Sequence, residues 1–477
     1  MHGLQRRFGF NTTVAIIVGT VIGSGIFMKP ALMASQLGSP LLLLSVWVLA
    51  GIVSLFGAMS NAELAAADPD TGGPYVYFRK IYGEGFAFLY GWAAFAVFNT
   101  AGTASIAYVF AHYASWFIEL PSFPDRTVSS LVIHLPGVGA LMPLENIGEK
   151  LLTVLLVTLL TILNYFSAGM GGAVQRVLTT LKAMAIALLI IGLLAGGGGS
   201  SDHELFAATT NGPVGWALLA AYFAALGGAF WAYDGWNNIS FMAGEIKEPQ
   251  RNIPRGLFVG MVFCVLVYVL VNLAYLYVLP IATMAGSTLV ASDAAKVVWG
   301  SIGCGLVAAL VVLSTMGATS ANVLATARVT YAVGAQFKGL SWVGKVRPTS
   351  RTPGNALLLQ LAWMLVLIFS GSFDMLTDML IFVSWFFYGM LALGVIIQRT
   401  RGKGPARSYS VPGYPWVPGS FVLFTAAFLV ITVWSDVADY LAGRSVLINS
   451  LLGTLITCAG LPIYLLLRRG RHRDDGQ

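Results

Sequence analysis

Three small residues interrupt the first long apolar segment of the chain, which covers residues 11–36. Gly23, Ser24 and Gly25 lie near the middle of that segment. Glycine in a helix interior is less favourable than alanine by about 0.5–1 kcal/mol, and in hydrocarbon each freed N–H or C=O needs a partner. Two interpretations stay open: a broken helix whose freed backbone groups bind a polar ligand, or a packing face formed by Gly19 and Gly23.

A second apolar segment, 214–244, also carries polar residues at its middle. Asp234 and Asn237 stand there next to Gly235. A carboxylate at this depth is costly unless it faces a cavity or a partner. The two interrupted segments are five spans apart. Because five is odd, a second set of five spans that starts at the second segment crosses the membrane in the opposite direction to the first set. This pattern favours a transporter built from an inverted repeat, with its site where the broken helices meet.

The composition sets the class of protein. Of 477 residues, 57% are hydrophobic and 10% are charged, whereas a soluble chain carries about 25% charge. Apolar runs of membrane-spanning length recur throughout, which predicts a polytopic helical membrane protein without a sizeable soluble domain. The predicted spans are 11–36, 40–65, 83–117, 150–168, 173–196, 214–244, 253–280, 300–336, 354–371, 374–398, 416–436 and 446–467.

The basic residues predict the orientation. If the N-terminus is inside, 21 of the 27 Lys and Arg residues lie on the side of the two termini. This excess predicts that both termini are cytoplasmic. We expect the protein in the cell membrane (inner or plasma membrane). One lysine, Lys182, lies within a span. The charges are dispersed between spans, so we expect contact with lipid and no nucleic-acid partner. The other side holds Lys29, Arg126, Lys150, Lys296 and Arg444.

The sequence gives little support for disulfide bonds, a metal site or an enzyme active site. The three cysteines, Cys264, Cys304 and Cys458, do not pair by spacing, so neither a disulfide framework nor a metal site is expected. No hydrolase, metalloprotease or nucleotide-binding motif occurs. We therefore expect no catalytic residues, no cofactor and no metal. An intramembrane enzyme or a channel remains a remote alternative.

Four stretches together resemble the amino acid–polyamine–organocation superfamily, and most closely its L-amino-acid transporter branch, the light-chain-type exchangers. The resemblance implies a LeuT-like, all-α integral membrane fold. It has twelve transmembrane helices, of which spans 1–5 and 6–10 form inverted repeats with broken helices 1 and 6. The stretches are 18–27, 231–237, 244–254 and 409–415. The domains are then 1–10, 11–200 (first repeat), 201–400 (second repeat), 401–467 (two extra helices) and 468–477 (basic tail).

The resemblance also implies a substrate, an α-amino acid, and the residues that bind it. Backbone N–H groups after the first break would hold its carboxylate, helped by the helix dipole and the Ser24 hydroxyl. Carbonyls around both breaks would hold its ammonium group. Trp231 would gate the site and Trp385 would lie near the substrate side chain. The implied binding residues are Val21, Ile22, Gly23, Ser24, Gly25, Ile26, Phe230, Trp231, Ala232, Asp234 and Trp385.

Two charged residues have open roles. Asp234 either recognises cationic side chains, couples a proton, or is structural. Lys182 is expected to take the region where related sodium-coupled proteins hold an ion, and to bond the first break and hydroxyls of span 8 such as Ser320. It would then hold the inward gate closed. The alternative is a lysine that extends to the cytoplasmic interface.

The expected function is sodium-independent L-amino acid exchange by alternating access, with neutral and possibly cationic substrates. A proton-coupled symporter is the alternative. Loop 118–149 has no cysteine, so no disulfide-linked heavy chain is expected, and we expect a functional monomer.

Overall fold

A computed structural model describes residue 6 and residues 8–68, 73–166, 172–197, 199, 212–348, 350, 352–402 and 408–474. It confirms an all-α membrane protein. Within these ranges, nine helices are long and apolar enough to cross a membrane, and a bent helix pair and two shorter apolar helices add to them. Together they provide one element for each of the twelve predicted spans. The inverted repeat stays a prediction.

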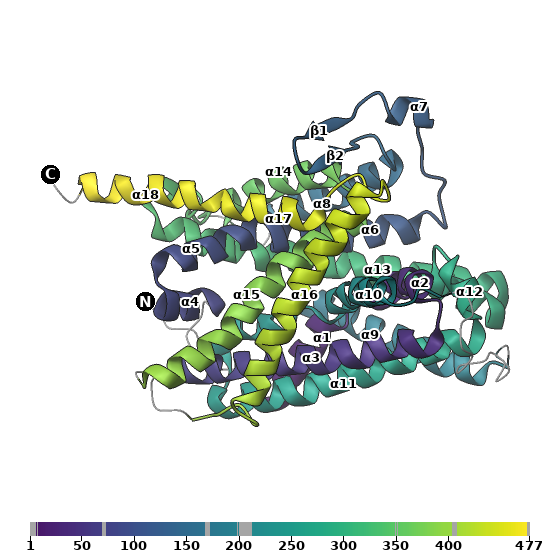
Figure 1. Ribbon diagram of the computed structural model, residues 1–477, viewed down its shortest axis with the longest axis horizontal. Helices are drawn as coiled ribbons and strands as arrows, with labels where there is room; N and C mark the ends of the chain where they lie inside the picture. Colours follow the sequence, from purple (N-terminus) through teal and green to yellow (C-terminus); the bar gives the residue numbers. More distant parts are fainter. Residues whose placement is uncertain are drawn as a thin grey trace. The chain divides into compact units, whose positions relative to one another are not determined.

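The chain forms two compact units. The first unit comprises Met1–Ala87, Leu189–Trp299 and Ser384–Thr432. Within it, α3 and α11 run side by side (Figure 1), and α1 packs against α11. Its helices are α1 Phe10–Val21, α2 Gly25–Leu37, α3 Pro40–Ala67, α4 Pro74–Tyr82, α10 Trp216–Tyr233, η2 Trp236–Glu245, α11 Pro249–Val278 and α12 Ile281–Ala285. It also holds the end of α15 Phe373–Arg401 and most of α16 Trp416–Leu441.

The helices of the first unit begin and end where local chemistry dictates. Ser39 caps α3 by accepting a hydrogen bond from the Leu42 N–H, and Pro40 takes the first helical position. Gly38 ends α2 in the left-handed region. Before α1, Phe8 pairs with the segment that follows η2: its N–H donates to Glu245 O (3.0 Å) and its carbonyl accepts from Lys247 N (2.8 Å).

The second unit comprises Phe88–Leu188, Gly300–Val383 and Val433–Gln477. Here α6, α8 and α14 pack against one another. Its elements are most of α5 Glu84–Ala93, η1 Ala94–Asn99, α6 Thr100–Ala114, α7 Asp125–Val128, α8 Ile147–Phe166, most of α9 Gly172–Ala195, α14 Gly354–Ser370, α17 Asn449–Cys458 and α18 Gly460–Asp474. The long α13 Val290–Gln336 passes from the first unit to the second at Gly300.

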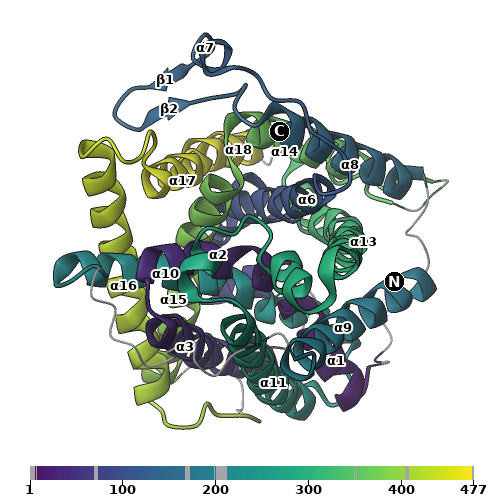
Figure 2. The same cartoon turned by 90° about the vertical axis from the view of Figure 1, so that its right-hand side faces the viewer.

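The structure differs from the expected spans in two places. Loop 118–149, which the sequence predicts only as a connection between spans, contains α7 and an antiparallel hairpin of β1 Ile133–Leu135 and β2 Gly139–Leu141 (Figure 2). Span 8 begins ten residues early because α13 includes a separate helical start before Gly300, whose φ of 65° breaks the helix. Only glycine adopts that backbone conformation without strain.

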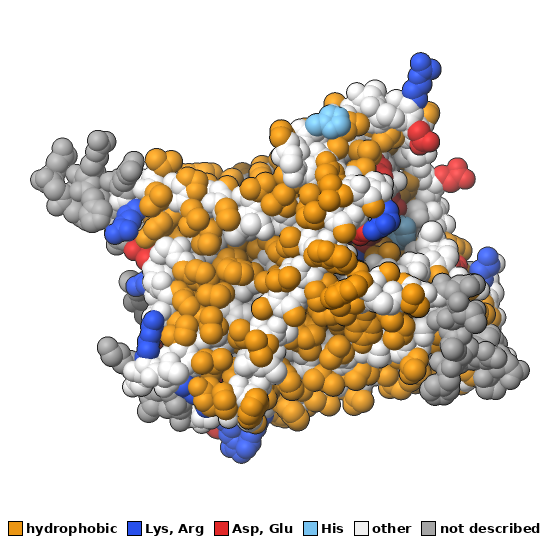
Figure 3. Space-filling model, viewed as in Figure 1, with side chains coloured by type: hydrophobic (Ala, Val, Ile, Leu, Met, Phe, Trp, Pro, Cys, Tyr) orange, Lys and Arg blue, Asp and Glu red, His pale blue; other side chains and the backbone are white. Residues whose placement is uncertain are grey.

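Hydrophobic side chains cover most of the face shown in Figure 3. On α16, Leu423 and Val430 are 73% and 68% exposed. A soluble protein rarely exposes large contiguous apolar surfaces, whereas helices that face lipid present them.

Candidate substrate site

The predicted break in the first span is present. Helix α1 ends at Val21, Ile22 turns to an extended conformation (ψ 94°), and α2 begins at Gly25, bent from α1 by 45°. The N–H groups in the first turn of α2 have no carbonyl one turn earlier in the same helix, and they carry the positive end of its dipole. Ser24 is 5% exposed, and its hydroxyl has no partner among the described residues. This break can bind an anion.

The second break follows α10. Tyr233 ends the helix, Asp234 is extended (ψ 152°), and Gly235 lies at a φ of 112° before the 3₁₀ helix η2. Glycine is required at 235 for two reasons. The positive φ strains other residues, and an added Cβ would lie 2.7 Å from Thr20 O. The Thr20 hydroxyl donates to Gly235 O (3.3 Å), so the second break touches the end of α1.

The two breaks lie in contact within the first unit. A Cβ added to Gly25 would lie 2.6 Å from both Cα and Cβ of Ala232, closer than real side chains approach a backbone. The start of α2 therefore lies directly against the last turn of α10, and Figure 2 shows these two helices adjacent. This contact brings together the predicted residues 21–26 and 230–234.

Aromatic rings border the same region. The Phe230 and Trp385 ring centroids are 3.7 Å apart, which joins α10 to α15. The Trp231 ring is 9% exposed, and Lys29 Nζ lies 5.9 Å from its centroid. The structure thus places Trp385 beside the break region. Its place near the substrate side chain and the gating role of Trp231 both stay predictions.

Asp234 has a partner that the sequence did not indicate. The Tyr388 hydroxyl donates to Asp234 Oδ1 (2.7 Å), and the Tyr388 ring packs 4.8 Å from that of Trp236. The carboxylate is half-buried. One of its oxygens is therefore already engaged by a neutral donor from α15, which holds the carboxylate at the edge of the second break.

Lys29 is a buried cation. The charge count assigned it to the outer side, which stays a prediction, and the structure shows it 1% exposed within α2. Its stem lies over Gly228, where an added Cβ would be 3.4 Å from Lys29 Cδ. The small residue on α10 makes room for this cation between the two helices.

Lys182 and Ser320 belong to the second unit. Lys182 is half-buried on α9. Ser320 lies on α13, where its carbonyl and hydroxyl oxygens lie 3.3 and 3.4 Å from Asn164 Nδ2. The coupling role of both residues stays a prediction. The cytoplasmic interface of the alternative was expected near Arg176, whose side chain lies outside the described part of the chain.

Tyr268 is the residue near the site that the sequence analysis missed. It lies on α11, is 0% exposed, and its hydroxyl contacts backbone groups of both breaks. A single tyrosine in an apolar run gives no sequence signal, since the chain has 18 tyrosines.

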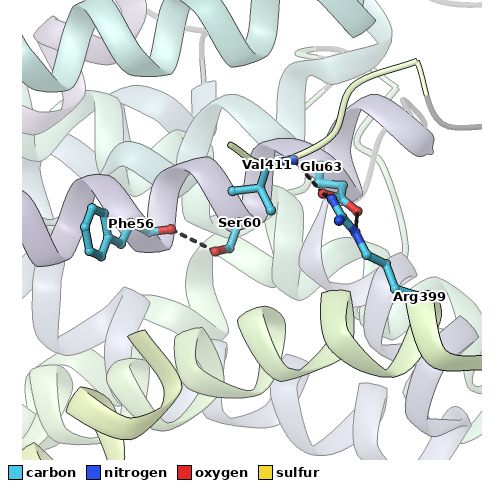
Figure 4. Close-up of polar contacts among 5 residues, drawn as sticks. All are labelled: Phe56, Ser60, Glu63, Arg399 and Val411. Carbon is cyan, nitrogen blue, oxygen red and sulfur yellow. Dashed lines mark hydrogen bonds and ion pairs between the residues drawn. The ribbon is translucent and has the colours of Figure 1, made fainter. Parts of the chain in front are cut away.

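A buried ion pair stabilises the same unit away from the breaks (Figure 4). Arg399 Nε and Nη2 donate to the two Glu63 oxygens at 2.8 and 2.5 Å, and the Val411 N–H donates to Glu63 Oε2 at 2.7 Å. The guanidinium stacks 3.8 Å from the Tyr414 ring centroid. Burial and the Glu63 charge raise the pKa of the nearby Tyr409 phenol. This cluster joins α3, α15 and the segment before α16 through a bidentate contact.

Comparison with known proteins identifies the family of this chain. Residues 8–457 match the amino acid permease family. The chain is 31% identical to the serine/threonine exchanger SteT of Bacillus subtilis (strain 168), over 98% of each chain. It is 28% identical to the human cystine/glutamate transporter, over 97% of this chain and 85% of the relative.

A third relative is the mouse large neutral amino acids transporter small subunit 2, which is 29% identical over 97% of this chain and 81% of its own. All three relatives are amino acid transporters by name. The chain therefore belongs to the amino acid permease family, in the L-amino-acid transporter branch of the amino acid–polyamine–organocation superfamily.

Proposed function

We infer that this protein is a sodium-independent L-amino acid exchanger that works by alternating access and prefers neutral amino acids. One observation carries the inference: the start of α2 and the last turn of α10 meet at Gly25 and Ala232. The buried Ser24 hydroxyl beside them has no hydrogen-bond partner within the described part of the chain. A zwitterion needs donors for its carboxylate and acceptors for its ammonium group. The two contacting breaks supply both.

The carboxylate would lie at the start of α2. The N–H groups of Ser24, Gly25 and Ile26 and the Ser24 hydroxyl are donors there, and the helix dipole adds a favourable field. The ammonium group would lie on the carbonyl side, near Val21 at the end of α1 and Ala232 in the last turn of α10. Each end of the zwitterion then meets groups of the opposite polarity.

The charges near the breaks support neutral side chains. Asp234 already accepts a hydrogen bond from Tyr388, whereas the buried Lys29 places a positive charge beside Trp231. A cationic side chain near Trp231 would be repelled by Lys29 through a medium that screens poorly. The preference for neutral substrates agrees with the names of two relatives, a serine/threonine exchanger and a large neutral amino acids transporter.

Sodium independence rests on Lys182, which the family resemblance assigns to the region of a sodium ion. A fixed ammonium group there replaces the ion's charge. We expect Lys182→Ala to reduce transport strongly while the protein is still produced. The conservative control Lys182→Arg keeps the charge, and full activity of Lys182→Ala would refute the role.

Exchange is tested in proteoliposomes with a panel of neutral, cationic and acidic amino acids. Efflux of a loaded neutral amino acid should rise several-fold when the same amino acid is added outside, with or without sodium. An inward pH gradient without internal substrate should not drive uptake. Uptake driven by that gradient would instead identify a proton-coupled symporter, for which the Asp234 carboxylate is the candidate proton carrier.

A further inference from the structure

Glu63 and Arg399 form a buried ion pair that joins α3 to α15 (Figure 4). Their side chains are 6% and 13% exposed, and two guanidinium nitrogens donate to the two carboxylate oxygens. Charged side chains within membrane spans are costly, and they are typical of functional regions. A bidentate contact also fixes geometry, because neither helix can turn or slide without misaligning two hydrogen bonds. The pair therefore sets the rotation and the register of α15 against α3.

The face of α15 that carries Arg399 also carries Tyr388. The helix is continuous over Phe373–Arg401, and the two residues are eleven positions apart. Eleven residues of an α-helix make three turns to within about 20°, so the two side chains lie on one face, about 16 Å apart along the axis. Ala392 and Val395, which lie between them on this face, are buried. One buried stripe of α15 thus connects the ion pair to the second break.

At the other end of this stripe, Tyr388 holds the residues on both sides of Gly235. Its hydroxyl donates to Asp234 Oδ1 (2.7 Å), and its ring centroid lies 4.8 Å from that of Trp236. The φ of 112° at Gly235 sets the direction of the chain between these two residues. A rotation or a shift of α15 would therefore move the groups that hold the second break.

Helix α3 also holds the segment that follows this break. The buried Asn61 amide donates to the Ser240 hydroxyl (2.8 Å), which joins α3 directly to η2. The contacts form a closed ring: α3 bonds to α15 through the ion pair, α15 bonds to Asp234, and η2 bonds back to α3. The second break is thus held by two connections to α3, one direct and one through α15.

We propose that Glu63 and Arg399 are positioning residues for the substrate site. Their ion pair sets the rotation and register of α15, which keeps the Tyr388 hydroxyl bonded to Asp234. This proposal rests on the proposed function. The pair acts on the site from about 16 Å away along α15, and the hydrogen bond between Tyr388 and Asp234 transmits its effect.

The test is a double-mutant cycle in proteoliposomes, with the KM for L-serine exchange as the readout. Glu63→Gln keeps the size of the side chain, but it removes the charge and replaces one acceptor by a donor, so the bidentate contact is lost. We expect the KM to rise about 5-fold in Glu63→Gln and about 10-fold in Tyr388→Phe. In the Tyr388→Phe background, Glu63→Gln should raise the KM less than about 2-fold further, because the hydrogen bond through which it acts is already absent.

A merely structural role of the ion pair predicts a different result. Glu63→Gln would then raise the KM by the same factor with and without the Tyr388 hydroxyl, and that result would overturn the proposal. Ser24→Ala provides the matched background, because Ser24 belongs to the first break. There, Glu63→Gln should again raise the KM about 5-fold. Equal coupling to Ser24 and to Tyr388 would also overturn the proposal.

Two further variants complete the test. Arg399→Lys keeps the charge and loses the planar two-pronged contact, so the KM should rise about 3-fold. If Glu63→Gln does not fold, Arg399→Lys takes its place in both cycles, and independent effects would again overturn the proposal. Arg444→Gln, which removes the exposed ion pair with Asp439, is the control and should leave the KM unchanged.

The outcomes also distinguish this proposal from the proposed function. If the wild-type protein exchanges no amino acid of the panel, the proposed function fails, and this proposal fails with it. If the protein exchanges L-serine, but the substitutions at Glu63 and Tyr388 act independently, only the positioning role of the ion pair fails.

Discussion

The two breaks that meet at Gly25 and Ala232 are built differently. The first uses the small residues Gly23, Ser24 and Gly25, and a regular helix of 13 residues follows it. The second uses Asp234 and a left-handed Gly235, and a 3₁₀ helix follows it. The first break presents the N–H groups that start α2 besides the Val21 carbonyl, and the second presents carbonyls and a carboxylate. Their difference in polarity matches the two ends of a zwitterion.

This contrast has a consequence for tolerance to substitution. Direct backbone contact makes Gly25 of the first break and Gly235 of the second both intolerant of added volume. The polar groups of the second break, in contrast, are held by side-chain hydroxyls from other helices, Tyr268 and Tyr388. We therefore expect substitutions at the first break to have the larger effects, and the following predictions test that order.

Gly25→Ala should have the largest effect. Its Cβ would lie 2.6 Å from the Ala232 backbone, which cannot yield as a flexible side chain can. Overpacking costs about 1–3 kcal/mol, and at the upper end exchange would fall about 100-fold. The control is Gly419→Ala on α16, where an added Cβ meets no atom within 4 Å. Near-normal exchange by Gly25→Ala would show that the two breaks do not need to touch.

Ser24→Ala should raise the KM for neutral amino acids about 10-fold, because a hydrogen bond to a charged group contributes about 1.5–3 kcal/mol. The maximal rate should change less. Ser420→Ala is the matched control, since its exposed hydroxyl only donates to Val417 O in its own helix. An unchanged KM in Ser24→Ala would show that the Ser24 hydroxyl does not bind the substrate carboxylate, which the backbone N–H groups would then bind without it.

Lys29→Met should make lysine a better competitor of neutral uptake by about 5-fold, because a buried charge near the site is removed while the stem over Gly228 is kept. Uptake of neutral substrates should change little. Lys296→Met, at an exposed position of the same unit, serves as the control. If lysine competes no better, the charge of Lys29 does not reach the bound side chain.

Asp234→Asn should have the smallest effect, about 3-fold on neutral exchange, because the amide oxygen can still accept from Tyr388. Competition by lysine, ornithine and arginine should be unchanged. A selective loss of that competition would instead assign Asp234 to the recognition of cationic side chains. Substitutions at the second break would then affect transport as strongly as those at the first.

The sequence predicted the elements better than their partners. Apolar runs located the twelve spans, and glycines next to polar residues located both breaks, because both features are local. The contacts of Tyr268 and Tyr388 could not be predicted, since hydropathy identifies a span and not its neighbours. Tyr388 is 154 positions from Asp234. The burial of Lys29 was missed for the same reason, because it depends on Gly228 of another helix.

The pairing of Phe8 with the segment after η2 limits the mechanics of the first unit. Helix α1 is tied to η2 at both ends: at Phe8 through Glu245 and Lys247, and at Thr20 through Gly235. Because α1 and η2 are hydrogen-bonded near both of their ends, we expect them to move together as one rigid body. If the protein works by alternating access, α1 before the first break and η2 after the second would change orientation together. A substrate that changes the backbone at either break would then move both segments.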